Sequence, residues 1–431
     1  MRATKESGIS WLGEYPSDWE LKKIKYCLQE RVEKNNPVRT TEILSLTAKQ
    51  GVIPYDQKEG GGNKPKEDVS AYRLAYPGDI VMNSMNILSG SVGLSQYFGC
   101  VSPVYYMLRP WKVTEDVRYY NYIFQTTMFQ RSLFGLGNGI LIKESGNGKL
   151  NTIRMRIPMD KFGGLFIPVA PIDEQKRIAD FLDAKCAEID ALTADIQTQI
   201  DTLEQYKRSV ITETVTKGLN PDVEMKDSGI EWVGEIPMHW PVHPVYSYYG
   251  ERKNKNRLGK EDNLLSLSYG RVIRKDINTN DGLLPESFNT YNIVEEGDII
   301  IRPTDLQNDK RSLRTGLVKE HGIITSAYID LCPLKQVDSR YFHFLLHAYD
   351  VMKVFYNMGN GVRQGLNYSE FSRLMVFEPP YEEQVAMADY LETKVTEVDA
   401  IIEQKKEQMA VLDAYKCSLI FEYVTGKKEV I

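Results

Sequence analysis

The chain has 431 residues, of which 42% are hydrophobic and 26% charged, and its formal net charge is −6. This composition is typical of a globular protein of two to four domains. No run of about 18 apolar residues and no apolar leader occurs, so we expect neither a membrane span nor a signal peptide, and a cytoplasmic location. The five cysteines never form a CxxC pair, which argues against a disulfide framework and against a zinc site.

An internal repeat extends over nearly the whole chain. The segment Ser7–Trp19 returns as Ser228–Trp240, with Ser, Gly, Ile, Trp, Gly, Glu, Pro and Trp in the same places. The offset between matching residues is 222 at Gly139 and 209 from Pro171 onward, which indicates a 13-residue insertion in the first copy before about Ile157. A repeat of this length predicts two structural units of the same type.

The first copy begins with a globular block, residues 1–171. Its short apolar runs, such as Asp79–Met82 and Val104–Leu108, are separated by Gly, Asn and Pro, which is typical of short β-strands. The block has an excess of basic residues, and Lys58 and Lys64 flank a run of glycines. Basic loops suit contacts with phosphate groups, although such a cluster is also common on a solvated surface.

A long helix is predicted for residues 172–218. From Ile172 to about Val215 the sequence contains neither Gly nor Pro, and apolar residues recur every seven positions. This spacing is typical of a coiled-coil seam. The seam positions are Leu182, Ile189, Ile196, Leu203 and Val210, with Ile178, Leu192 and Tyr206 interleaved.

The second copy repeats this plan. Residues 219–378 form a second globular block with basic clusters at Arg252–Lys260 and Arg302–Arg314, and residues 379–431 contain a second long helix. We predict that this helix extends from Glu382 to about Val424.

The second helix has a weaker apolar stripe than the first. Leu391, Val398, Leu412 and Leu419 lie on its seam, and Lys405 interrupts it. Two helices with one stripe each most simply bury the stripes against each other, and antiparallel and parallel pairs are both reachable within one chain. Dimerisation through either stripe is the competing hypothesis.

Several patterns resemble catalytic motifs, but each has a simpler structural explanation. Glu378-Pro-Pro-Tyr381 is similar to a methyltransferase motif, yet its first residue is wrong, and its repeat counterpart is a proline-containing segment before the first helix. Pro221-Asp222 crowds nuclease-like residues into one linker, and no phosphate-binding P-loop is present. His343 and His347 could face one metal ion, but the apolar residues around them favour a buried helix. We therefore predict a chain that is not an enzyme.

The motifs together resemble the specificity subunit of type I restriction–modification systems, HsdS. They are the twice-stated SGIxWxGExPxxW, the Gly-Asp-Ile before a VSPxY or TSAY strand, and the APIDEQ or PPxxEQ segment before a long helix. The likeness covers essentially the whole chain. Two features depart from the family pattern, the insertion after Gly139 and the break at Lys405.

This resemblance implies a fold and a function. The fold class is α+β: two tandem target recognition domains of short strands and helices (1–171 and 219–378), each followed by a helix (172–218 and 379–431). The helices would pair as an antiparallel coiled-coil spacer with pseudo-twofold symmetry. Each domain would recognise one half of a bipartite, asymmetric site in double-stranded DNA.

The partners implied by the family are two copies of the methyltransferase subunit, together with restriction or translocase subunits. No cofactor is expected in this subunit; S-adenosylmethionine, ATP and Mg are implied for the partners. The alternatives are a non-catalytic coiled-coil scaffold that binds protein instead of DNA, and an enzyme that uses Glu378-Pro-Pro-Tyr381.

Candidate DNA-contacting residues follow from side-chain chemistry, because Asn or Gln pairs with adenine and Arg with guanine in the major groove. An Asn between glycines can instead be present only to allow a left-handed turn. In the first block the candidates are Lys58, Lys64, Asn83, Ser84, Asn86, Asn138, Lys143, Arg154 and Arg156. In the second they are Arg302, Thr304, Gln307, Asn308, Lys310, Arg311, Arg314, Asn360, Arg363, Gln364 and Asn367.

The four repeated tryptophans, Trp11, Trp19, Trp232 and Trp240, have a different interpretation. Side chains that recognise bases should differ between two domains with different half-sites, whereas these are identical. We predict that they hold the first segment of each block against the helices or against a partner surface.

Overall fold

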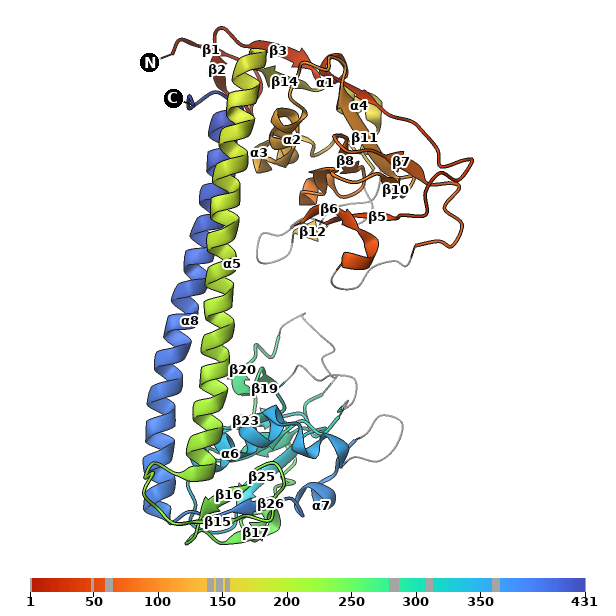
Figure 1. Ribbon diagram of the computed structural model, residues 1–431. Helices are drawn as coiled ribbons and strands as arrows, with labels where there is room; N and C mark the ends of the chain where they lie inside the picture. The colour runs from red at the N-terminus through yellow and green to blue at the C-terminus, as the bar shows by residue number, and fades with distance from the viewer. Residues whose placement is uncertain are drawn as a thin grey trace. The chain divides into compact units, whose positions relative to one another are not determined.

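The computed structural model describes residues 2–47, 50–58, 65–137, 143–144, 150–151, 156–278, 287–304, 306, 313–358 and 365–430. The chain forms two compact units (Figure 1). Unit 1 consists of Met1–Ile196 with Glu407–Ile431, and unit 2 consists of Gln197–Lys406. Each long helix therefore contributes one part to each unit.

Unit 1 is built around a four-stranded antiparallel sheet. Its strand order is β4 (Leu28–Glu30), β11 (Tyr105–Pro110), β8 (Ile80–Asn83) and β9 (Val92–Leu94). Alternating side chains of these strands enter two separate apolar clusters: Met82 and Tyr106 belong to one, Val81 and Met107 to the other. This is the period-two alternation expected of a strand that is buried on both faces.

Two-stranded antiparallel sheets and short helices surround the central sheet of unit 1. The strand pairs are β1 (Thr4–Glu6) with β2 (Glu14–Pro16), β3 (Glu20–Lys23) with β14 (Phe166–Val169), β5 (Leu44–Thr47) with β6 (Gly51–Pro54), β7 (Arg73–Ala75) with β10 (Gly99–Val101), and β12 (Lys143–Glu144) with β13 (Leu150–Asn151). The helices are α1 (Ile24–Cys27), η1 (Tyr55–Gln57), η2 (Ile87–Ser89), α2 (Val117–Gln125), α3 (Thr127–Ser132) and α4 (Met159–Gly163).

Unit 2 repeats the same plan. Its four-stranded sheet has the order β18 (Tyr249–Glu251), β25 (Ile329–Pro333), β22 (Ile299–Ile301) and β23 (Thr315–Leu317). The strand pairs are β15 (Met225–Asp227) with β16 (Glu235–Pro237), β17 (Val242–Pro244) with β26 (Met375–Phe377), β19 (Leu265–Ser268) with β20 (Arg271–Arg274), and β21 (Asn292–Val294) with β24 (Gly322–Ile324). The helices are η3 (Val245–Ser247), α6 (Ser339–Val351), η4 (Val354–Asn357) and α7 (Tyr368–Phe371).

The extra strand pair of unit 1, β12 with β13, lies within the predicted insertion. In the described part of unit 2 no strand pair corresponds to it. The repeat and its insertion are therefore both visible in the strand order.

The two long helices were predicted correctly. α5 extends over Ile172–Lys217 and α8 over Tyr381–Val424. Acidic residues lie in the first turn of each, Asp173 and Glu174 in α5, where they complement the helix dipole. The segment Glu378-Pro-Pro-Tyr381 leads into α8, as predicted, because the Pro380 carbonyl accepts hydrogen bonds from the first backbone N–H groups of that helix.

The predicted seven-residue seam of α5 is wrong at two of its three interleaved positions. Leu192 and Tyr206 are exposed, by 52% and 50%. The buried isoleucines of α5 recur every eleven residues, at Ile178, Ile189, Ile200 and Ile211. An eleven-residue repeat corresponds to about 3.67 residues per turn, which is closer to the 3.6 of an undistorted helix than the 3.5 of a heptad. In α8, Ile401 and Tyr415 would occupy the interleaved positions of a heptad seam, and both are exposed as well.

Within unit 1, the first half of α5 lies beside the last half of α8. The rings of Phe181 and Tyr423 are 4.4 Å apart between centroids, and Lys416 Nζ is 2.6 Å from Asp190 Oδ1. Within unit 2, the last half of α5 contacts the first half of α8, where Lys207 Nζ lies 2.6 Å from Asp399 Oδ1. Lys405, predicted to break the seam, donates a hydrogen bond to Gln199.

Trp19 and Trp240 hold the first segment of each globular block against the long helices, as predicted. Both are fully buried, and their indole N–H groups donate to Glu174 (2.9 Å) and Glu383 (3.0 Å) in the first turns of α5 and α8. Beyond the helix ends, Gly426 lies against Trp19 in unit 1, just as Gly218 lies against Trp240 in unit 2. Each tryptophan thus joins the start of one long helix to the end of the other.

Other repeated residues also serve this framework. Arg118 forms ion pairs with Asp180 and Asp183 of α5, and Arg340 forms the matching pairs with Asp389 and Glu392 of α8. Across the described ranges, no helix combines the length and apolar character needed to cross a membrane.

Candidate nucleic-acid interface

The structure brings three of the predicted DNA-contacting residues of unit 1 into one hollow. This hollow, which we call the amide hollow, has a volume of about 410 Å³ and includes Lys58, Asn83 and Asn86. Its other lining residues are Ile43, Leu44, Ser45, Tyr55, Pro65, Tyr72, Met85, Ser102, Val104 and Tyr105. Polar groups suited to hydrogen bonding and three tyrosine rings therefore surround one space.

Local backbone geometry positions the amides of this hollow. Asn83 ends β8, and its side-chain oxygen accepts a hydrogen bond from the Met85 N–H at 3.0 Å. Asn86 precedes the short helix η2 and is exposed. The Lys58 ammonium lies 5.9 Å from the centre of the Tyr55 ring. A cation is therefore held beside one of the tyrosines that line the hollow.

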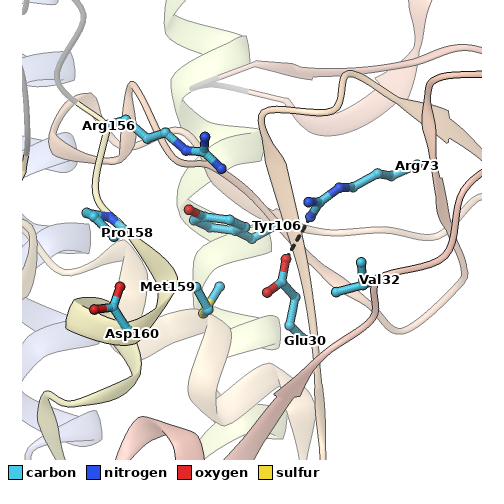
Figure 2. A pocket seen from close by; sticks show the side chains of 8 residues that line it. All are labelled: Glu30, Val32, Arg73, Tyr106, Arg156, Pro158, Met159 and Asp160. Atoms are coloured by element: carbon cyan, nitrogen blue, oxygen red, sulfur yellow. Dashed lines mark hydrogen bonds and ion pairs between the residues drawn. The ribbon is translucent and has the colours of Figure 1, made fainter.

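A second hollow of about 480 Å³ contains Arg156 and is called the arginine hollow here (Figure 2). The guanidinium groups of Arg156 and Arg73 point toward the ring of Tyr106 from two sides, and Arg156 lies 5.9 Å from the ring centre. Arg73 is paired with Glu30 at 2.6 Å, and the Tyr106 hydroxyl donates to the Ile157 carbonyl at 3.0 Å. Arg156 itself is exposed.

The two hollows lie on opposite faces of the central sheet, because Tyr105 and Tyr106 are neighbours on β11. Tyr105 pairs with Asn83 of β8 and contributes to the amide hollow. The Tyr105 hydroxyl is neutral at neutral pH, as in any tyrosine, and burial raises its pKa further.

Ser84 is buried and is held by a hydrogen bond inside unit 1. Its side chain is 1% exposed, and its hydroxyl donates to the Val104 carbonyl at 2.7 Å. A side chain in this position does not reach a base edge. Lys143 lies in β12, whose backbone pairs with β13.

Three described candidates of unit 2, Arg302, Thr304 and Arg314, lie between β22 and β23. Arg302 is half-buried and Thr304 is exposed. Arg314, in contrast, is fully buried, and its guanidinium donates to the Tyr356 hydroxyl at 3.0 Å and to the Thr304 carbonyl. The expectation that Arg314 faces DNA therefore does not fit this geometry, because the charge is enclosed and hydrogen-bonded inside the unit.

Asn367 is exposed but has a local role. Its side chain caps α7 by accepting from the Glu370 N–H at 3.0 Å, while the Glu370 carboxylate accepts from the Asn367 N–H. This reciprocal arrangement is a capping box, which explains an Asn at this position without a ligand.

The other predicted residues lie outside the described residues. They are Lys64, Asn138, Arg154, Gln307, Asn308, Lys310, Arg311, Asn360, Arg363 and Gln364.

The sequence interpretation missed the tyrosines and Arg73. Tyr105 and Tyr106 were identified only as part of an apolar strand, although two adjacent tyrosines on a strand must face opposite sides of the sheet. Tyr55 and Tyr72 reach the amide hollow from segments far away in the sequence.

The histidine pair lies on a helix with buried apolar side chains, as predicted. His343 and His347 lie on α6, and burial lowers the pKa of His343 to about 3 and that of His347 to about 4. Among the described residues, no group of three or more His, Cys, Asp or Glu side chains could hold a metal ion.

Comparison with known proteins identifies a class. No family model matches the chain. The similar curated proteins are specificity subunits of type I restriction enzymes, and a solved chain with the same fold comes from work on the complex assembly and conformational transition of the type I R-M system. The resemblance inferred from the sequence motifs is thereby confirmed.

The particular relatives are two proteins of Methanocaldococcus jannaschii. The putative type I restriction enzyme MjaX specificity subunit is 24% identical, over 97% of this chain and 96% of its own length. The MjaVIII specificity subunit is 25% identical over 62% of this chain and 63% of its own. The type I R-M chain has a TM-score of 0.66 and 12% identity, covering 95% of this chain and 98% of that chain.

Proposed function

We propose that the chain is the DNA specificity subunit of a type I restriction–modification complex. The observation that carries this proposal is the division of the repeat into constant and variable parts. The framework contacts, such as Trp19 with Glu174 and Trp240 with Glu383, are the same in both units. The residues at the ends of β8 and β22 differ, as expected if two units on one framework recognise different half-sites.

In unit 1, we assign DNA contacts to the amide hollow and to Arg156. Asn83 and Asn86 would form hydrogen bonds with base edges, and Lys58 would contact phosphate. The tyrosine rings restrict where a base or sugar can lie. Ser84 is left out because it is buried.

In unit 2, Arg302 and Thr304 are the described candidates for DNA contact. Lys143 of β12 remains part of the proposal. So do the predicted residues outside the described range: Lys64, Asn138 and Arg154 in the first block, and Gln307, Asn308, Lys310, Arg311, Asn360, Arg363 and Gln364 in the second. Arg314 and Asn367 are left out because their side chains have structural partners.

The two long helices would act as an antiparallel coiled-coil spacer. The helix contacts within each unit support this orientation. α5 has 46 residues, so it is roughly 70 Å long at 1.5 Å per residue. A spacer of this length suits half-sites between one and two turns of DNA apart, where one turn is about 34 to 36 Å.

The catalytic work would belong to the partners. Two methyltransferase subunits would use S-adenosylmethionine, and restriction subunits would use ATP and Mg. The exposed apolar side chains of the helices, Leu192, Tyr206, Val411 and Tyr415, are candidates for docking these partners. A pseudo-twofold relation between the units would give two equivalent docking surfaces.

The test is to sequence methylated DNA from the host with and without this gene. Deletion should abolish one bipartite methylation motif. If every methylated motif persists after deletion, the specificity role is wrong, and a protein-binding scaffold is the better explanation.

A narrower test addresses the amide hollow. Asn83→Ala combined with Asn86→Ala should reduce discrimination at one half-site by at least tenfold, because a lost bidentate base contact costs about 1–3 kcal/mol. Lys112→Ala, on an exposed loop outside both hollows, serves as the matched control. Equal loss at both half-sites in a folded protein would contradict two independent recognition units.

A further inference from the structure

A cluster of buried polar groups lies at the base of the loop between β22 and β23. It consists of Arg314, Asp350 and Tyr356, which are 0%, 0% and 5% exposed. Arg314 precedes β23, Asp350 is near the end of α6, and Tyr356 lies in η4. Charged groups at this depth need well-placed hydrogen-bond partners, since burying an unpaired charge is costly.

The groups of this cluster satisfy one another. The Arg314 backbone N–H donates to the Asp350 carboxylate, and the Arg314 Nε–H donates to the Tyr356 hydroxyl at 3.0 Å. That hydroxyl donates in turn to Asp350 Oδ1 at 2.9 Å. The cluster therefore fixes both the backbone and the side chain of Arg314.

The cluster also holds the first end of the loop. A terminal nitrogen of Arg314 donates to the Thr304 carbonyl, and the Arg302 N–H donates to the Arg314 carbonyl at 2.8 Å. The two ends of the segment that carries Gln307, Asn308, Lys310 and Arg311 are thus joined through one side chain. Extended guanidinium donors can join several acceptors at once, which a lysine ammonium does less well.

The residue that follows shortly after the second candidate segment, Leu366, lies beside Pro303 and Thr304. The Leu366 N–H donates to the Pro303 carbonyl at 3.0 Å, so the residues after the 359–364 segment meet the loop beside Thr304. Tyr356 lies shortly before that segment. The described residues that flank both predicted segments, Thr304 and Leu366, are consequently connected to the Arg314 cluster directly or through Pro303.

Unit 1 has the same backbone bonds without the charges. The Asn83 N–H donates to the Ser91 carbonyl at 3.0 Å, and the Ile157 N–H donates to the Ser84 carbonyl at 3.0 Å. By these bonds Ser91 is the counterpart of Arg314. The described part of unit 1 contains no buried arginine–aspartate pair at this place.

We propose that Arg314 is a positioning residue for DNA recognition by unit 2: with Asp350 and Tyr356 it holds Arg302 and Thr304, the described candidates for DNA contact, in place without touching a base itself. This inference rests on the proposed function. It also reverses the expectation from the sequence, in which Arg314 was itself a contact.

The experiment compares three variants in the full chain with its methyltransferase partner. Arg314→Met should lower the melting temperature and reduce discrimination at the unit 2 half-site at least tenfold, with the unit 1 half-site unchanged. Arg314→Met combined with Asp350→Asn should recover much of the melting temperature, because it removes the buried carboxylate charge and keeps an oxygen that can accept from the residue 314 N–H and the Tyr356 hydroxyl. It should not recover discrimination, because the bonds to Thr304 are still missing.

Arg314→Lys is the conservative variant and should retain more discrimination than Arg314→Met, because it keeps one donor near Thr304. The proposal is overturned if discrimination returns together with stability in the double variant, which would make Arg314 important only for folding. It is also overturned if Arg314→Met discriminates as the wild type does. If the wild-type chain itself yields no bipartite methylation motif, the proposed function has failed instead.

Discussion

Asp330 is a buried carboxylate whose replacement should stabilise unit 2. It lies on β25 opposite Ile300 and is 1% exposed. Neither of its side-chain oxygens has a hydrogen-bond partner among the described residues. The nearest cation, the Arg252 guanidinium, is 4.0 Å away and is bonded to Asp298 at 2.7 Å. One arginine thus faces two buried carboxylates and satisfies only one.

Burial, together with the charge of Asp298, raises the pKa of Asp330 to about 8. In the unfolded chain the pKa is near its ordinary value of 3.8. The fold therefore favours the protonated form. The stability contributed by this form is fully present below about pH 4 and is lost as the pH rises through about 8.

The loss of stability follows from the difference between the pKa of Asp330 in the folded chain and its pKa in the unfolded chain. Each pKa unit corresponds to about 1.4 kcal/mol, so keeping Asp330 protonated at pH 7 costs up to about 4 kcal/mol. Asp330→Asn removes this cost but leaves a buried amide, and we expect a net gain of about 2 kcal/mol at pH 7. For a unit of this size that gain raises the melting temperature by roughly 4–8 °C.

The measurement is thermal unfolding of the wild type and Asp330→Asn at pH 5 and pH 8. The gain should be larger at pH 8, where the wild type has lost more stability. An equal gain at both pH values, or a loss at both, would refute the reasoning. Asp298→Asn is the matched control and should destabilise the chain, because it removes the partner of Arg252. Asp330→Met offers a second check, because the counterpart in unit 1 is the buried Met107.

Two further predictions concern the framework. Trp19→Phe keeps most of the buried ring but removes the hydrogen bond to Glu174, and should lower the stability of unit 1 by about 1–3 kcal/mol in denaturant unfolding. No change would show that this bond contributes nothing. Gly426→Ala should cost more than 1 kcal/mol, because the backbone there has a φ of 70° and a Cβ would lie 2.3 Å from Pro16. The same substitution at exposed Gly8, also at φ 70° but with open space around it, isolates the steric part.

The framework contacts of the long helices could be predicted from the sequence because the residues that make them are repeated in both units. Trp19 and Trp240, Gln175 and Gln384, and Arg118 and Arg340 keep their identities at matching positions, and the structure gives each pair equivalent bonds. A residue that both units need for the same contact can therefore be recognised in the sequence as a repeated residue.

The buried positions of the long helices could be predicted only in part from the sequence. A seven-residue count matched Leu182 and Ile189 but failed at Leu192, because it assumes the underwinding of a supercoiled helix. The eleven-residue series of isoleucines was present in the sequence as well. Both periods fit the first two turns, and only a contact with the second helix distinguishes them.

The role of Arg314 could not have been derived from its own neighbourhood. An arginine in a polar loop has the composition of a phosphate or base contact. What encloses it is Asp350 and Tyr356, which follow it by 36 and 42 residues and have no sequence pattern that links them to it. The amide side chains of unit 1 could be found by type, because their chemistry is local, whereas the partners of a buried charge are set by the fold. For candidate recognition residues of this kind, the sequence indicates candidate loops by residue type, and the structure shows which of the described side chains are exposed and which, like Arg314, are buried and hydrogen-bonded.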